Sequence, residues 1–195
     1  AVLITPRGAE TLRLGRLAPD DARPPDEHTR SGVASVTKLF TGILLADLLR
    51  EGRLGLDDSA SRWLPRPLPR YGDKEITLRH LTTHSSALPV GAPGQSFLKT
   101  VSWFSLRVWR IAFRRYLLRQ GVGPLAGVTT DDVLAWLADY RLPRAPGAQR
   151  EYSNVGYGLL AEALGRADGR GYEAALRARV IGPLGLKGTA FARDP

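Results

Sequence analysis

Apolar and polar positions along the chain predict a mostly helical protein that begins with two short strands. Residues 1–5 (AVLIT) and 11–17 (TLRLGRL) favour strands, and residues 6–8 (PRG) between them suit a hairpin turn. Residues 36–50 (VTKLFTGILLADLLR) are apolar on nearly all sides. This pattern predicts a buried helix, which Gly52 ends.

Weaker patterns predict further helices in the rest of the chain. Asp57 and Asp58 are expected to cap a short helix that runs to Leu64, where prolines follow. Other helical segments are expected at residues 76–83, at residues 131–140 behind a Thr129–Asp132 capping box, and from Val155 and Gly171 onward.

One basic region stands apart from the otherwise balanced charge of the chain. The net charge is +9, and no acidic residue occurs between Ile76 and Thr130. Within residues 97–120, apolar positions recur at helical spacing while several arginines share the opposite face, which predicts a basic amphipathic helix. Such a helix fits a lid packed on the domain or an anionic membrane surface. Single-stranded nucleic acid is the less favoured partner.

Length and composition narrow the class of protein. A chain of 195 residues is long enough for one sizeable core, and no charge block divides it. The absence of cysteine excludes disulfides, thiol catalysis and cysteine-ligated metals. No apolar stretch is long enough to span a bilayer. The chain contains no methionine, even at position 1, so we expect it to begin downstream of its natural start.

Ser35 and Lys38 form a Ser-x-x-Lys motif at the start of the long apolar helix. Three residues apart on a helix, their side chains share a face, with about 5–6 Å between Cβ atoms. A serine hydroxyl is a weak nucleophile until a neighbour accepts its proton, and this spacing suits that transfer. The helix N-terminus favours developing negative charge, so the Ser35 amide is a candidate half of an oxyanion hole.

A second motif, Tyr152-Ser153-Asn154, follows 117 residues after Ser35. A phenol close to an ammonium group ionises more readily, so Tyr152 beside Lys38 would take the serine proton and return it to the leaving group. Asn154 would bind a substrate amide. The competing interpretation is that Tyr152 is a packing aromatic and Asn154 a helix cap.

Four ordered segments carry a resemblance to the β-lactamase-related serine hydrolases. These segments are residues 35–65, 76–89, 146–164 and 172–191. The sequence most resembles the class C branch, which includes class C β-lactamases, D-alanyl-D-alanine carboxypeptidases and esterases. The resemblance implies Ser35 as the acylated nucleophile, Lys38 as its proton partner and Tyr152 as general base and acid. It also implies Asn154 as a contact of the substrate and of Lys38.

The resemblance implies an α/β (α+β) fold of the β-lactamase/transpeptidase type, with a helical domain beside an incomplete antiparallel sheet. We expect residues 1–195 to be one partial domain: N-terminal strands and loop over 1–34, and the nucleophile helix and helical region over 35–195. Residues 95–127, where the resemblance lapses, form a divergent insertion that includes the basic amphipathic helix.

The family's third motif, a Lys-Thr-Gly or His-x-Gly strand, is missing after Asn154. Residues 187–189 (KGT) have related letters but follow a helix, at a position where the family has a connection ahead of that strand. The strand normally supplies the second oxyanion N–H. We therefore expect an N-terminal piece with little activity of its own.

The expected function is that of a serine hydrolase or acyltransferase acting through an acyl-enzyme on Ser35. Its substrate would be a small molecule or peptide with an ester, peptide or β-lactam carbonyl, with esterase or peptidase-like hydrolysis favoured over antibiotic resistance. The alternative is a non-catalytic binding or membrane-associated domain. Family members of this kind imply a periplasmic, secreted or cell-envelope location.

No cofactor and no metal are expected. His80 and His84 are four apart, a spacing that would bring them together on one helix face. The segment between them lacks the glutamate of a zinc hydrolase motif, so structural roles are expected for both. Asp57 and Asp58 are expected to cap a helix, a role that requires no metal.

Overall fold

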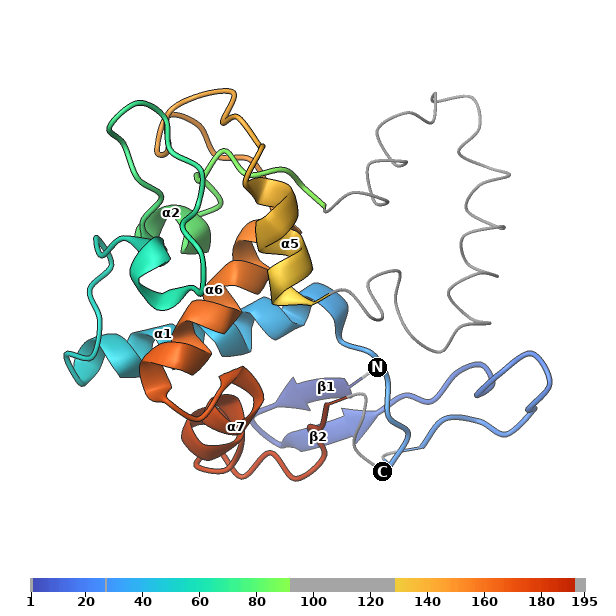
Figure 1. Cartoon of the computed structure of the whole chain (residues 1–195). Helices are drawn as coiled ribbons and strands as arrows, with labels where there is room; N and C mark the ends of the chain where they lie inside the picture. The colour runs from blue at the N-terminus through green and yellow to red at the C-terminus, as the bar shows by residue number, and fades with distance from the viewer. Residues whose placement is uncertain (1, 27, 92–128, 192–195) are drawn as a thin grey trace.

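Helix α6 (Asn154–Asp168) is the centre of the fold, seen in a computed structural model that describes residues 2–26, 28–91 and 129–191. It packs against the nucleophile helix α1 (Thr37–Arg50) and against α7 (Tyr172–Leu176). Helices α2 (Leu78–Thr82) and α5 (Thr130–Leu137) contact α6 away from α7 (Figure 1). The predicted basic helix at 97–120 and the insertion at 95–127 lie outside the described residues.

Leucines fill the interface between these helices. Leu44 and Leu48 of α1 and Leu160 and Leu164 of α6 have no exposed surface. Burial of each such side chain stabilises the fold by about 1.5–3 kcal/mol relative to its exposure. The opposite face of α1 differs, because Leu39 there is 63% exposed. The prediction of a helix buried on nearly all sides is therefore correct for one face only.

The two ends of α1 follow the expected local chemistry. A short 3-10 turn, η1 (Ala34–Val36), precedes the helix and contains Ser35. At the other end Gly52 has a left-handed φ of +69°, and the N–H of Arg53 donates to the carbonyl of Leu48 over 3.1 Å. Gly52 therefore ends α1, as the sequence predicted.

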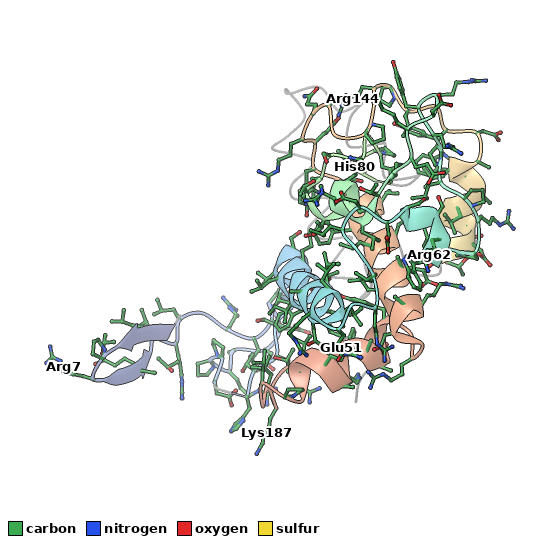
Figure 2. All side chains as sticks on the ribbon, turned by 90° about the vertical axis from the view of Figure 1, so that its left-hand side faces the viewer. Arg7, Glu51, Arg62, His80, Arg144 and Lys187 are labelled. Atoms are coloured by element: carbon green, nitrogen blue, oxygen red, sulfur yellow. The ribbon has the colours of Figure 1, made fainter. Side chains whose placement is uncertain are left out.

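The N-terminal strands form the predicted hairpin, but the second strand lies earlier in the chain than predicted. Strands β1 (Val2–Thr5) and β2 (Gly8–Thr11) pair antiparallel, with Thr5 opposite Gly8. The prediction of a strand at 11–17 was wrong, because a two-residue turn brings the chain back into pairing at Gly8 and the ladder ends at Thr11. Figure 2 shows the hairpin, with Arg7 near its tip, projecting away from the helices.

The short helix near residue 60 is not capped as predicted. It is the 3-10 segment η2 (Ala60–Trp63), and its N-cap residue, Ser59, makes no side-chain capping bond. Asp57 instead accepts hydrogen bonds of 2.7 and 2.8 Å from the guanidinium of Arg79. Asp58 accepts from the backbone N–H of Gly55 over 2.8 Å. Asp58 therefore stabilises the turn before η2, and Asp57 ties that turn to α2.

The other predicted helices are present with small changes in their bounds. The Thr129–Asp132 capping box forms at α5: Thr129 Oγ1 accepts from the N–H of Asp132, and Asp132 Oδ2 accepts from the N–H of Thr129. Helix α7 continues into η4 (Arg177–Ile181), a π-helical stretch. None of the described helices is both long and apolar enough to cross a membrane.

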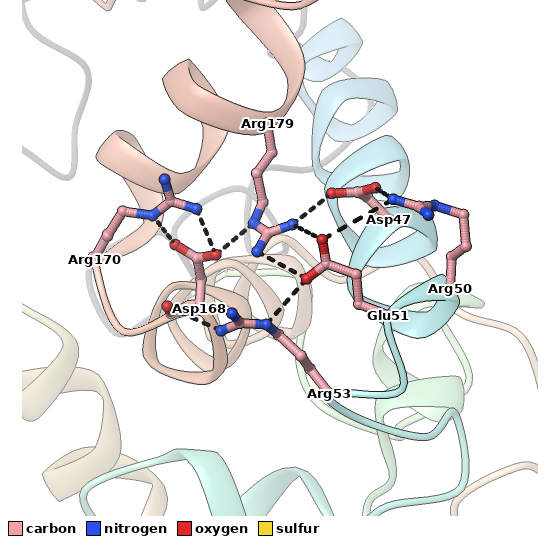
Figure 3. Close-up of polar contacts among 7 residues, drawn as sticks. All are labelled: Asp47, Arg50, Glu51, Arg53, Asp168, Arg170 and Arg179. Carbon is pink, nitrogen blue, oxygen red and sulfur yellow. Dashed lines mark hydrogen bonds and ion pairs between the residues drawn. The ribbon is translucent and has the colours of Figure 1, made fainter.

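A cluster of ion pairs ties the end of α1 to α6 and η4 (Figure 3). Arg179 of η4 donates to Asp47 over 2.7 Å, to Glu51 over 2.7 and 2.9 Å, and to Asp168 over 2.5 Å. Arg170 also donates to Asp168, whose side chain has no exposed surface. The cluster therefore links three segments through one guanidinium, which fixes the C-terminal half of the nucleophile helix.

Candidate active site

Ser35 and Lys38 meet Tyr152 at the N-terminal end of α1. Ser35 Oγ lies 2.7 Å from the phenolic oxygen of Tyr152, which is hydrogen-bond distance. Lys38 Nζ lies 3.5 Å from Ser35 Oγ, at the outer limit of a hydrogen bond. Ala34, immediately before Ser35, has a left-handed φ of +45°, a strained conformation of the kind that clusters at functional sites.

Asn154 completes the contacts of Lys38. Lys38 Nζ donates to Asn154 Oδ1 over 2.9 Å. Ser153, not Asn154, is the N-cap of α6: its Oγ accepts from the N–H of Gly156 over 2.9 Å and donates to the carbonyl of Pro89 over 2.6 Å. The side chains of the motif alternate, so the buried Ser153 anchors the segment while its neighbours face Lys38.

The competing interpretation of the second motif does not fit this geometry. Helix capping falls to Ser153, and Asn154 instead contacts the ammonium group of Lys38. Tyr152 is 42% exposed, and its hydroxyl faces Ser35. All four predicted site residues therefore come together: Ser35, Lys38, Tyr152 and Asn154.

The neighbours of Tyr152 favour its ionised form. The Lys38 ammonium, and then the Ser35 hydroxyl, hold the pKa of Tyr152 below its ordinary value of about 10, while partial burial opposes them. Lys38 Nζ also lies 4.9 Å from the centre of the Tyr152 ring. A phenolate in this position can accept a proton from Ser35 Oγ directly.

The segment that carries Tyr152 is held by the chain that follows α2. The N–H of Gly147 donates to the carbonyl of Ser85 over 2.8 Å, and the N–H of Glu151 donates to the carbonyl of His84 over 2.7 Å. The N–H of Asn154 donates to the carbonyl of Val90 over 2.9 Å. These bonds join residues far apart in sequence, so the loop before α6 has a fixed backbone.

The two histidines both bond to backbone N–H groups, as their expected structural roles require. His80 Nδ1 accepts from the N–H of Thr77 over 3.1 Å within a capping box. His84 Nδ1 accepts from the N–H of Ser153 over 3.1 Å. They share no helix face, because α2 ends at Thr82 and His84 has a left-handed φ of +58°. The contact of His84 with the site was not predicted, because no pattern in the neighbouring residues indicates it.

A metal or a third motif finds no support within the described residues. Over 2–26, 28–91 and 129–191, no three histidine, aspartate or glutamate side chains are grouped to hold a metal ion. Between Asn154 and Phe191, all of which is described, the chain forms helices and turns and no strand. Residues 187–189 lie in turns, with the N–H of Lys187 donating to the carbonyl of Gly185.

Comparisons with known proteins show the family of the chain. The family model described as Beta-lactamase matches residues 1–195. The chain is 32% identical to the D-alanyl-D-alanine-carboxypeptidase/endopeptidase AmpH of Escherichia coli K12, over 93% of the chain and 42% of that protein. It is also 32% identical to esterase EstB of Burkholderia gladioli, over 98% of the chain and 46% of that protein.

A solved structure of a similar protein has the same fold. The β-lactamase/D-alanine carboxypeptidase from Yersinia pestis, in complex with citrate, superposes with a TM-score of 0.73 at 28% identity. The match covers 92% of this chain and 46% of that one. The chain thus spans less than half the length of these relatives. With its family model matched throughout and its helices arranged as in a known member, the chain belongs to the Beta-lactamase family.

Proposed function

We propose that the protein is a serine hydrolase or acyltransferase that forms an acyl-enzyme on Ser35. The observation that carries this proposal is the 2.7 Å contact between Ser35 Oγ and the Tyr152 phenol, next to Lys38. A nucleophile, a proton acceptor and a cation that favours ionisation of that acceptor lie together at the start of one helix. These are the nucleophile and the proton-transfer groups that an acyl transfer requires.

The reaction then has two halves. Ser35 Oγ attacks the carbonyl carbon of the substrate while its proton passes to the Tyr152 oxygen. The tetrahedral intermediate collapses when the bond to the leaving group breaks, and the leaving group takes the proton back from Tyr152. Water or another nucleophile attacks the Ser35 ester and releases the acyl group by the same route in reverse.

Lys38 and Asn154 support these steps. The Lys38 ammonium favours the ionised form of Tyr152 and is itself held by Asn154 Oδ1 at 2.9 Å. The backbone N–H of Ser35, within η1 and just before α1, is suited to contribute to an oxyanion hole. Asn154 also offers an amide group for the substrate.

The proposed substrates carry an ester, peptide or β-lactam carbonyl. Similarity to proteins named as an esterase and as a carboxypeptidase/endopeptidase supports the ester and peptide classes. A location in the periplasm, cell envelope or outside the cell fits a peptidase of that kind. We also infer that the described helices belong to one domain, because their buried residues, from Leu44 to Val180, form a single core.

Covalent labelling tests this proposal. We expect a fluorescent fluorophosphonate to label the full-length protein, and Ser35→Ala to abolish that labelling. Ser31→Ala is the matched control, because Ser31 is exposed and lies only four residues from the nucleophile. Equal labelling of the Ser35→Ala variant would overturn the assignment of Ser35, and a wild-type protein that is not labelled would favour a non-catalytic domain.

A further inference from the structure

His84 lies directly behind the proposed general base. The residue is only 8% exposed, and its ring centre lies 4.5 Å from that of Tyr152 and 4.8 Å from that of Tyr157. Its Nδ1 accepts the N–H of Ser153, and its backbone carbonyl accepts the N–H of Glu151. His84 thus contacts Tyr152 through the ring and accepts the N–H groups of the two residues that flank it.

The same two tyrosine rings also face Lys38. Lys38 Nζ lies 4.9 Å from the ring centre of Tyr152 and 5.4 Å from that of Tyr157. The hydroxyl of Tyr157 donates to the carbonyl of Thr82 over 3.2 Å, which fixes the second ring. His84 and Lys38 therefore share a pair of aromatic neighbours, and the positive charge of Lys38 disfavours protonation of His84.

We propose that neutral His84 is a positioning residue that holds Tyr152 against Ser35, and that protonation of its imidazole lowers the rate of acylation. This inference rests on the proposed function of Ser35 and Tyr152. His84 does not touch the reacting atoms. It acts through the backbone of Ser153 and the ring of Tyr152.

Hydrogen-bond chemistry gives the reason for the pH effect. An Nδ1 atom that accepts an N–H must be unprotonated, so neutral His84 carries its proton on Nε2. On protonation, Nδ1 becomes a donor that faces the N–H donor of Ser153. The bond is then lost, and the segment that carries Tyr152 loses one of its anchors.

Nearby charges influence the pH at which His84 becomes protonated. The charged groups that act on His84 are Lys38 from α1 and Arg150 from the loop before α6, and both oppose a positive imidazole. The nearby carboxylate of Glu151 is paired with Arg144. Burial first, and then these two cations, lower the pKa of His84 below 6.5. The imidazole is therefore neutral at neutral pH and becomes charged only at a lower pH than an ordinary histidine.

Two substitutions of His84 distinguish the effect of its hydrogen bond from the effects of its ring and of its protonation. His84→Asn places an amide oxygen where Nδ1 was, cannot titrate, and suits a left-handed backbone. His84→Phe keeps a ring beside Tyr152 but removes the acceptor. His80→Asn is the matched control, because His80 also accepts a backbone N–H through Nδ1 but belongs to the cap of α2.

The experiment measures the rate of fluorophosphonate labelling of the full-length protein between about pH 5 and pH 8, the range in which histidines titrate. We expect the wild-type and His80→Asn rates to fall together on the acid side. His84→Asn is expected to keep most of the wild-type rate at neutral pH and to show a smaller fall on the acid side, where only the protonation of Tyr152 remains. For His84→Phe we expect a loss of about a hundredfold at neutral pH, as for a misplaced catalytic group.

Either of two results would overturn the role of His84. One is a fall on the acid side in His84→Asn that matches the wild type, and the other is a His84→Phe variant that labels as fast as the wild type. If His84→Phe fails to fold, the profile of His84→Asn alone decides. A wild-type protein with no Ser35-dependent labelling at any pH would instead overturn the proposed function and this inference with it.

Discussion

The helices around α6 and the N-terminal hairpin differ in what surrounds their leucines. In the helical region Leu44, Leu48 and Leu160 have no exposed surface. In the hairpin and the segment after it, Leu3 and Leu12 are 60% exposed and Leu14 is 75% exposed. The helical region therefore supplies its own packing partners within the described chain, and the hairpin does not.

The proposed active site depends on the packed region. Ser35 and Lys38 belong to η1 and α1, while Tyr152 and Asn154 precede and begin α6. Packing of α1 on α6 thus brings together groups more than a hundred residues apart. The hairpin contributes none of the four site residues. Changes in the two regions should consequently have different effects on labelling and on stability.

The largest effect is expected from removing the ammonium group of the site. Lys38→Met deletes the contacts to Ser35 and Asn154 and raises the pKa of Tyr152 toward that of a free phenol. We expect fluorophosphonate labelling to slow by about a thousandfold, within the range of general acid–base catalysis. An ultraviolet titration should also detect ionisation of Tyr152 at higher pH. Lys187→Met, at an exposed lysine, is the control, and equal loss in both variants would contradict the role of Lys38.

A matched pair of leucine substitutions tests the packing difference. In the 195-residue chain, Leu44→Ala opens a cavity between α1 and its neighbours and is expected to lower the free energy of unfolding by about 3 kcal/mol. Leu14→Ala removes an exposed side chain, so we expect a change within about 0.5 kcal/mol. Urea unfolding measures both. Similar losses in the two variants would mean that the hairpin region is as well packed as the helices.

A smaller effect, which depends on pH, is expected at the ion-pair cluster. Arg170, and then Arg179, lower the pKa of Asp168 from 3.8 to about 2. Because the pKa is lower in the folded state, this stabilisation is complete above the unfolded pKa of about 4 and is lost as the pH falls through about 2. Asp168→Asn should cost about 2 kcal/mol at neutral pH and progressively less in acid.

Urea unfolding at neutral pH and at about pH 3 measures this dependence, since at the lower pH Asp168 is largely protonated in the unfolded chain but still mostly ionised in the folded protein. Asp20→Asn, at an exposed carboxylate, is the control and should have little effect at either pH. A constant difference between Asp168→Asn and the wild type across this range would show that the carboxylate is not stabilised by its ion pairs.

Local signals in the sequence predicted the elements that depend on neighbouring residues. The apolar run of α1, the glycine at its end and the Thr129 capping box are all encoded within a few positions, and the structure contains each of them. The convergence of Ser35, Lys38, Tyr152 and Asn154 was expected from the family resemblance, because spacing alone cannot bring α1 to α6.

The predictions that were wrong or incomplete concern long-range contacts and backbone conformation. Asp57 was expected to cap a helix, but Arg79, 22 residues away, pairs with it. His84 was compared with His80 as a helical pair, but its left-handed φ ends that periodicity and turns the ring toward Tyr152. Neither contact is encoded in the spacing of nearby residues.

The most direct test of the account is to locate the covalent adduct. The full-length protein is treated with a fluorophosphonate, digested, and its peptides are sequenced by mass spectrometry. We predict one modified residue, Ser35, with no modification of the buried Ser153. An adduct on any other residue, with Ser35 unmodified, would contradict the claim that Ser35 is the nucleophile.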